Sequence, residues 1–353
     1  MYYVTYLSKP RTRFGITEEE MRAEYARNFD KRVTKATTSS RGFKDFYKIT
    51  EALYRIFNNV TTAYNLPPWG INADMTDFSD KYETFTIPKA SGGVREITAP
   101  LPELRNAQRQ VLKIITKQCK FLPHNAAHGF TKNRNPKTAL QVHQANKSKW
   151  FLKADIKDFF PSCTAEALRK ALRETYPFYQ LDNSMRIMLV NLATKDGVLP
   201  QGSPLSPLLA NMIMIPFDIA LTEYCKANKL IYTRYADDIM ISSREHFNPG
   251  SVLIMVDTLL EQYGFNINHD KSRYGSSAGR NWNLGLMYNE AGDITVGHKK
   301  KKLVKTMVHN FTTKPEEQTQ ENKYKLLGIV GYCAYIEPDY FRPYLSKILQ
   351  VEI

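Results

Sequence analysis

Two adjacent carboxylates, Asp237 and Asp238, lie inside an apolar, β-prone segment at residues 230–241. Neighbouring anions are costly to bury unless cations hold them, so we expect a hairpin tip that presents both to a metal. A third carboxylate, Asp155, ends a strand-like segment at residues 151–155. Three carboxylates at two strand ends can bind two Mg²⁺ ions about 4 Å apart for in-line phosphoryl transfer. This pattern predicts a nucleotidyl transferase.

The composition favours a folded protein that binds a polyanion. Hydrophobic residues make up 42% of the chain, which argues against disorder. Its length of 353 residues is enough for two or three cooperating subdomains. Lysine and arginine number 49 against 35 acidic residues. The resulting net charge of +14 favours a nucleic-acid partner over a small acidic substrate.

Signals for export and metal binding by cysteine are missing from the sequence. The chain shows no secretory signal and no apolar run of about 18 residues, so we expect a cytoplasmic protein that spans no membrane. Four scattered cysteines are expected to be reduced: Cys119, Cys163, Cys225 and Cys333. Although His124 and His128 follow Cys119, a fourth ligand at zinc spacing is lacking, which favours a core or fingers role for all three.

The hydrophobic pattern predicts alternating helices and strands around the carboxylates. Helices are expected at residues 17–29, 43–60, 103–121, 164–175 and 251–263, in a long helix after a Pro-rich loop within 200–227, and in the basic segment 299–353. Strands are expected in hairpins at 82–88 with 94–99 and 283–288 with 294–296, and singly at 265–267. Between residues 150 and 275, the order strand, helix, strand hairpin, helix, strand predicts a ferredoxin-like α+β sheet.

Three segments resemble the catalytic motifs of prokaryotic reverse transcriptases: Asp155-Ile-Lys-Asp-Phe-Phe160, Leu199-Pro-Gln-Gly-Ser-Pro-Leu-Ser-Pro207 and Tyr235-Ala-Asp-Asp238. The resemblance extends over residues 85–345. It implies an α+β right-hand polymerase fold whose ferredoxin-like palm carries the carboxylates. The expected parts are a basic helical extension at 1–75, fingers at 76–150, a palm at 151–295 with a return to the fingers near 176–200, and a short helical thumb at 296–353.

The resemblance, together with the chemistry of carboxylates, implies a metal-binding role for the first and third motifs. Asp155 and Asp237 are expected to bind both Mg²⁺ ions, with Asp238 as support and the Ile156 carbonyl as one further ligand; Mn²⁺ is an expected substitute. One ion would lower the pKa of the primer 3′-hydroxyl, and the other would hold the triphosphate and pyrophosphate. Asp158 is interpreted as a solvated loop acid.

Other residues are expected to contact the deoxynucleotide. Lys89 and Arg95 flank a glycine turn and are expected to clamp the triphosphate. Phe160 is expected to exclude a 2′-hydroxyl, which implies dNTP over rNTP; the alternative is a core residue beside Phe159. Gln201 is expected to bind near the sugar or base.

Two further residues complete the expected nucleotide site. Gly202 is expected to let the backbone approach the nucleotide closely. Lys271 matches the family position proposed as general acid to pyrophosphate.

The remaining site residues are expected to contact the template–primer duplex. These are Tyr235 beside the paired aspartates and Gly285 in a hairpin that resembles the primer grip. The basic run Lys299, Lys300, Lys301 and Lys302 opens the expected thumb. Backbone contacts of this kind bind without base specificity and weaken with salt.

The resemblance implies an RNA-directed DNA polymerase that copies a structured non-coding RNA encoded beside it, in anti-phage defence. Expected partners are that RNA, the RNA/DNA hybrid, dNTPs and an accessory defence effector. A retron-type enzyme that makes RNA-linked DNA is the first alternative; residues 138–143 and 283–285 depart from the retron pattern. A catalytically vestigial RNA-binding scaffold is the second. An RNA-dependent RNA polymerase is the third, and Phe160 argues against it.

Overall fold

The computed structural model describes residues 40–67, 69–88, 92–119, 122–277, 282 and 284–351. The expected helix at 17–29 and the side chain of Lys89 lie outside these ranges. Besides the elements introduced below, the structure contains four short 3₁₀ turns: η1 (Ala73–Met75), η2 (Ser79–Lys81), η3 (Phe178–Gln180) and η4 (Pro315–Glu317).

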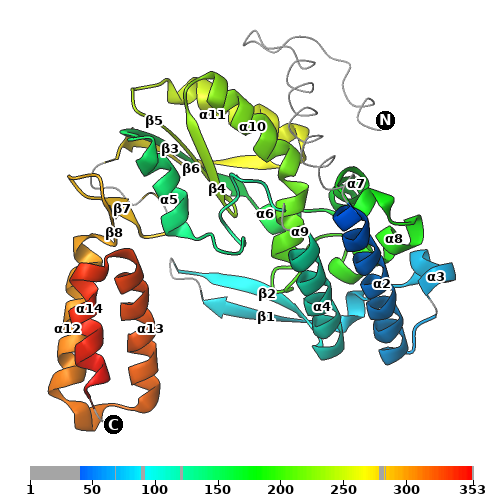
Figure 1. The fold of residues 1–353 in the computed structure, drawn as a ribbon, viewed down its shortest axis with the longest axis horizontal. Helices are drawn as coiled ribbons and strands as arrows, with labels where there is room; N and C mark the ends of the chain where they lie inside the picture. Colours follow the sequence, from blue (N-terminus) through cyan, green and yellow to red (C-terminus); the bar gives the residue numbers. More distant parts are fainter. Residues whose placement is uncertain are drawn as a thin grey trace.

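A four-stranded antiparallel sheet lies at the centre of the molecule (Figure 1). Its order is β4-β5-β3-β6, with β3 at Trp150–Lys157, β4 at Ile231–Tyr235, β5 at Asp238–Ser243 and β6 at Asn266–Ser276. Helix α7 (Ala165–Glu174) lies between β3 and β4 in the sequence, and α11 (Pro249–Gln262) between β5 and β6. This order is the ferredoxin-like arrangement, so the sequence-based prediction of the palm is confirmed.

The long helix expected to end near residue 227 is broken. It consists of α9 (Ser206–Ile213) and α10 (Ile215–Ala227), which are bent by 49° relative to each other. Pro216 occupies the first turn of α10, where its missing N–H costs nothing but prevents continuation from α9. In the part of the chain that the structure describes, no single helix is long and apolar enough to cross a membrane; this bent pair passes on length and composition alone.

Two strand predictions had the wrong lengths. The strand expected at 265–267 extends over the whole of β6, including a polar segment whose residues are mostly exposed or half-buried. The expected last hairpin shrinks to two residues in each strand, β7 (Met287–Tyr288) and β8 (Ile294–Thr295). Pairing with β3 stabilises the polar part of β6, and sequence alone carries no signal for that pairing.

The expected fingers hairpin is formed by β1 (Tyr82–Pro88) and β2 (Val94–Pro100), followed by α4 (Pro102–Gln118). Helix α2 (Ser40–Ala63) packs on α4, with α3 (Trp69–Asn72) and α8 (Asn183–Ala193) close by (Figure 1). Ile49, Leu53 and Phe57 of α2 are buried in the same core as the palm. From residue 40 onward, the expected N-terminal extension is therefore part of the main body.

A three-helix unit forms the thumb: α12 (Gly297–Thr313), α13 (Gln320–Ile336) and α14 (Pro338–Leu349). Figure 1 shows these helices side by side, away from α2 and α4. They share a second core with β7, β8 and two palm residues, Phe151 and Met240. Helix α5 (Pro136–Ala145) lies where the palm sheet and the thumb meet, and α6 (Phe159–Ser162) follows β3.

Candidate active site

The three aspartates converge where β3 meets the β4–β5 turn. Asp155 and Asp238 are direct cross-strand partners in the antiparallel β3–β5 pair. Asp237 lies in the turn itself, and its backbone carbonyl accepts a hydrogen bond of 2.9 Å from the N–H of Ile156. The register therefore brings the expected carboxylates together on one side of the palm. The role of the Ile156 carbonyl as a metal ligand stays a prediction.

Two lysines neutralise two of these carboxylates. The Nζ of Lys271 lies 2.8 Å from Oδ1 of Asp155, and the Nζ of Lys153 lies 2.7 Å from Oδ2 of Asp238. Lys153 was missed in the sequence analysis. Its signal was available, because a residue two positions before Asp155 on a strand points to the same face.

The third carboxylate has the most unfavourable electrostatic environment. Burial raises the pKa of Asp237, and the neighbouring charges of Asp238 and Asp155 add to the rise. A hydrogen bond to Asp155 raises the pKa of Lys271. Three acidic side chains therefore share two ammonium groups, which leaves an excess of negative oxygen ligands of the type that Mg²⁺ prefers.

The residues fit a hard cation by donor type, although no ready-made cage is present. Within the described residues, no group of three or more His, Cys, Asp or Glu side chains converges closely enough to hold a metal ion. Lysine ammonium groups lie against two of the carboxylates instead. The two-Mg²⁺ assignment and its tolerance of Mn²⁺ stay predictions.

A bulge in β6 aims Lys271 at Asp155. Lys153 pairs with Arg273 and Asp155 pairs with Asn268, so β6 advances five residues while β3 advances two. Extra residues of this kind bend a strand and redirect a side chain. Lys271 contacts the carboxylate of Asp155 in this structure, and its expected role as general acid stays a prediction.

The loop that carries Gln201 and Gly202 is attached to the fingers hairpin. The backbone carbonyl of Gln201 accepts a hydrogen bond of 2.8 Å from the N–H of Thr98 in β2. Gly202 has a φ of +135°, and a Cβ there would lie 2.7 Å from the Thr98 carbonyl oxygen. A fingers strand therefore makes a close approach that requires this glycine, and the approach to the nucleotide that we expected stays a prediction. Gln201 is half-buried.

The aromatic candidate for sugar discrimination lies between the core and solvent. Phe160 in α6 is half-buried, with ring centroids 5.5 Å from Phe159 and 6.1 Å from Phe130. Both expected interpretations, gate and core residue, are compatible with this position. Arg95 is exposed in β2, and Asp158 is exposed at a φ of 45°, as expected for a solvated loop acid.

A segment before α5 supports the β4–β5 turn that carries Asp237, and sequence reasoning missed it. Arg234 N donates to the Ala126 carbonyl, and the Arg234 carbonyl accepts from His128 N, both at 2.7 Å. A Cβ on Gly129 would lie 2.4 Å from the N of Ala236, so a glycine is required there. A single glycine in a polar stretch gives no advance signal of such a contact.

Residues expected to contact the duplex lie around the palm–thumb junction. Tyr235 is half-buried. Burial raises the pKa of Tyr332 in α13, and the nearby Tyr235 adds to that rise. Gly285 has a φ of +90° in a turn closed by a hydrogen bond of 2.9 Å from Trp282 N to the Leu286 carbonyl. Duplex contacts by Tyr235 and Gly285 stay predictions.

The basic run at the start of α12 is not uniform. Lys299, Lys300 and Lys302 are exposed. Lys301 instead lies 2.5 Å from a carboxylate oxygen of Glu337 and 4.6 Å from the ring centre of Tyr340. Lys301 therefore has a contact within the thumb, whereas all four lysines were expected to face the template–primer duplex.

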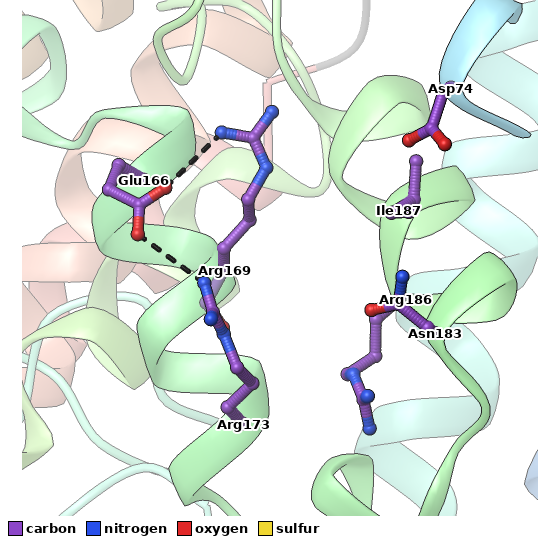
Figure 2. Close-up of a pocket in the computed structure, with 7 residues that line it drawn as sticks. All are labelled: Asp74, Glu166, Arg169, Arg173, Asn183, Arg186 and Ile187. Atoms are coloured by element: carbon purple, nitrogen blue, oxygen red, sulfur yellow. Dashed lines mark hydrogen bonds and ion pairs between the residues drawn. The ribbon is translucent and has the colours of Figure 1, made fainter.

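A separate surface pocket of about 430 Å³ lies between α7 and α8 (Figure 2). Its arginines already have partners: Arg169 and Arg173 lie 3.5 and 3.3 Å from the carboxylate of Glu166. Arg186 donates to the backbone carbonyls of Tyr179 and Leu181. The residues that line this pocket include none of the expected site residues, so the convergence of aspartates remains the candidate site.

Comparison with known proteins agrees with this geometry. A family model described as reverse transcriptase (RNA-dependent DNA polymerase) matches residues 87–330. The retron Mx162 reverse transcriptase of Myxococcus xanthus is 31% identical over 305 residues, covering 78% of this chain and 62% of that protein. The retron Ec83 reverse transcriptase of Escherichia coli is 29% identical over 266 residues, covering 73% of this chain and 83% of that protein.

Similarity to solved structures is weaker. A truncated apo telomerase from Candida tropicalis has a TM-score of 0.44 and 14% identity, covering 62% of this chain and 55% of its own. This identity and TM-score are too low to support any functional conclusion. The chain spans less than two thirds of the length of the Myxococcus relative.

Proposed function

Because this chain belongs to the reverse transcriptase family, we propose that it is an RNA-directed DNA polymerase that joins deoxynucleotides by metal-assisted nucleotidyl transfer. The observation that carries the proposal is the pairing of Asp155 with Asp238 across two strands, with Asp237 in the adjoining turn. Burial raises the pKa of Asp237, the charges of Asp238 and Asp155 add to the rise, and a bound cation would offset this cost.

We propose that Asp155, Asp237 and Asp238 hold the divalent metal. The bound ions would supply a lowered pKa for the primer 3′-hydroxyl and charge stabilisation for the departing pyrophosphate. Lys153 and Lys271 hold two of the carboxylates in place through their ion pairs. The hydrogen bond to Asp155 places the protonated ammonium of Lys271 beside the proposed metal site, where a proton donor for the pyrophosphate would have to lie.

The proposed partner is an RNA template paired with a growing DNA strand. Lys299, Lys300 and Lys302 are exposed in the first turns of α12, and the first turn contains no acidic residue. Cations are unfavourable at a helix N-terminus because the macrodipole is already positive there. An anionic partner, such as a phosphate backbone, removes this conflict and supports a nucleic-acid-binding role.

Similarity to retron enzymes favours the first alternative from the sequence, a retron-type reverse transcriptase that copies an associated structured RNA. The defence-associated assignment, with its accessory effector, rests on the motif resemblance alone. The vestigial scaffold is disfavoured, because all three acids are retained and converge with two lysines.

Primer extension tests the polymerase proposal. Purified protein with Mg²⁺, dNTPs and a primed RNA is expected to make DNA, and the same protein with Asp237→Ala and Asp238→Ala is expected to make none. If the folded wild-type protein gave no DNA on RNA that copurifies with it, the proposal would be wrong.

Sequencing of the copurified nucleic acid tests the finer proposal. One structured RNA together with DNA complementary to it is expected, with the two covalently linked if the enzyme is of the retron type. A mixture of unrelated cellular RNAs without matching DNA would contradict it.

A further inference from the structure

A fully buried ion pair lies directly behind the catalytic turn. The guanidinium of Arg234 in β4 makes two bonds to the carboxylate of Asp218 in α10, at 2.8 Å from Nε and 2.7 Å from Nη2. Both side chains are completely inaccessible to solvent. The hydroxyl of Tyr232 donates a third bond of 2.7 Å to the same carboxylate. Sequence analysis did not select either charged residue.

The third nitrogen of this guanidinium contacts the turn itself. Nη1 of Arg234 donates a hydrogen bond of 2.9 Å to the backbone carbonyl of Ala236. Ala236 has a φ of +57°, in the left-handed region that L residues with a Cβ rarely adopt. Such a conformation persists only where neighbouring groups enforce it. The next residue is Asp237, so the conformation of Ala236 sets the direction of that carboxylate.

Fold stability alone does not explain a buried pair at this position. Apolar residues of similar volume often replace buried ion pairs without loss of stability, because burying two charges costs about as much as their attraction returns. The planar guanidinium offers a combination that apolar residues lack, with two bonds fixed on α10 and a third directed at a turn carbonyl. Gly129 also lies close against the backbone of Ala236.

We propose that Arg234 and Asp218 are positioning residues, which hold Ala236 in its left-handed conformation and thereby fix where Asp237 presents its carboxylate to metal. This inference rests on the proposed polymerase function for its kinetic readout. It also predicts a property of the protein without substrate, namely its affinity for a divalent cation.

A charge-free double variant, Arg234→Met with Asp218→Leu, tests the proposal. We expect the melting temperature to fall by no more than roughly a few degrees, because removing two buried charges offsets the lost partners of the Tyr232 hydroxyl and the Ala236 carbonyl, and we expect unchanged RNA affinity. We expect kcat to fall roughly ten- to hundredfold, because small displacements of catalytic groups have effects of that size. Mn²⁺ affinity, measured by electron paramagnetic resonance without substrate, is expected to fall severalfold. Arg186→Met is the matched control, since Arg186 also donates to backbone carbonyls but lies away from the turn.

A rescue variant separates positioning from general packing. Arg234→Lys keeps the charge but loses the fork, so we expect reduced kcat and weaker Mn²⁺ binding. Adding Ala236→Gly is expected to restore part of both, because glycine adopts the left-handed conformation at little cost. An absence of any restoration would count against the proposal.

Two outcomes would overturn the inference. The first is a folded double variant with wild-type kcat and wild-type Mn²⁺ affinity. If the double variant does not fold, the second is a folded Arg234→Lys protein with both properties unchanged. If the wild type itself makes no DNA, the polymerase proposal fails, whereas the Mn²⁺ measurement still decides the positioning role.

Discussion

Lysine side chains balance two of the three acids at the candidate site. Lys271 pairs with Asp155 and Lys153 pairs with Asp238, and Asp237 has the raised pKa. The three aspartates and Lys271 could be selected from sequence because their types and spacing match a chemistry. Lys153 could have been selected by strand alternation.

We predict that Asp237→Asn removes activity without loss of stability. A folded-state pKa above the unfolded value means that the ionised carboxylate costs stability at neutral pH, so neutralising it is expected to raise the melting temperature by roughly a few degrees. DNA synthesis is expected to fall by about a thousandfold or more, equivalent to about 4 kcal/mol. Primer extension and thermal melting measure the two effects.

The matched control for this variant is Asp158→Asn. Asp158 is exposed and has a φ of 45°, a conformation that asparagine tolerates. Full activity is expected, and a comparable loss at both positions would show that Asp237 has no special role.

We predict that Phe160→Ala admits ribonucleotides. The ring is half-buried and truncating it opens space beside α6, so rNTP incorporation is expected to rise by about tenfold or more relative to dNTP. Competition between rNTP and dNTP in single-nucleotide extension measures this ratio. Phe130→Ala removes the neighbouring ring and is expected to leave discrimination intact. A wild type that already uses both nucleotides equally would exclude the gate.

At the scale of elements, the order of the palm strands could be predicted, whereas most irregularities within and between the elements could not. Apolar runs and turn residues gave β3, β4 and β5 in the right order. The break between α9 and α10 had a local signal in Pro216, which the prediction of one long helix overlooked. The bulge in β6, in contrast, depends on tertiary contacts, which local propensity does not encode. The same holds for Gly129, whose requirement arises from a contact more than 100 residues away in sequence.

We predict a loss of stability in mild acid that depends on two buried histidines. His143 in α5 bridges Ser242 of β5 and Thr233 of β4, at 2.5 and 2.8 Å, and His128 lies nearby. Burial lowers the pKa of His143 to about 3 and that of His128 to about 4. The unfolded chain therefore takes up protons first, and stability is lost as the pH falls below about 6.5 toward these values.

The expected cost at pH 5 is about 2 kcal/mol for each histidine. Urea unfolding between pH 7 and pH 5 measures it. His143→Gln is expected to be less stable at pH 7 but to show a shallower pH dependence. An unchanged slope in that variant would contradict the assignment.

We predict that the exposed lysines of α12 contribute to salt-dependent RNA binding. Replacing Lys299, Lys300 and Lys302 with glutamine is expected to reduce the slope of log affinity against log salt by about 2–3. Fluorescence anisotropy across a salt series measures the slope. Lys301→Gln, which removes an internal pair, is expected to leave the slope nearly unchanged. Equal slopes for the wild type and the triple variant would remove α12 from the RNA-binding surface.

At the scale of the whole molecule, the thumb shares a second core with Phe151 and Met240 of the palm, and a few polar contacts add to this attachment. The carboxylate of Glu337, between α13 and α14, accepts bonds from Thr295 Oγ1 at 2.8 Å and Val296 N at 2.9 Å. Lys137 of α5 donates to the carbonyls of Tyr335 and Ile336. The sequence predicted a basic helical thumb, but it offered no means of pairing residues so far apart.

We predict that loosening this attachment shortens the DNA product. Glu337→Ala removes the anchor to β8, so the thumb is expected to hold the duplex less firmly, and processivity is expected to fall severalfold. Addition of a single nucleotide is expected to change little. Primer extension with a heparin trap measures product length. Glu317→Ala, which removes an exposed pair with Lys314 within the thumb, is the control; equal product lengths in both variants would contradict the prediction.

The lysine–aspartate pairs have a consequence for how the molecule is handled in a cell or a test tube. Because lysines neutralise two of the three carboxylates, the protein is expected to fold without magnesium. A chelator is therefore expected to stop DNA synthesis reversibly without changing the melting temperature. The supply of metal would then control the activity of the protein and leave its folding unaffected.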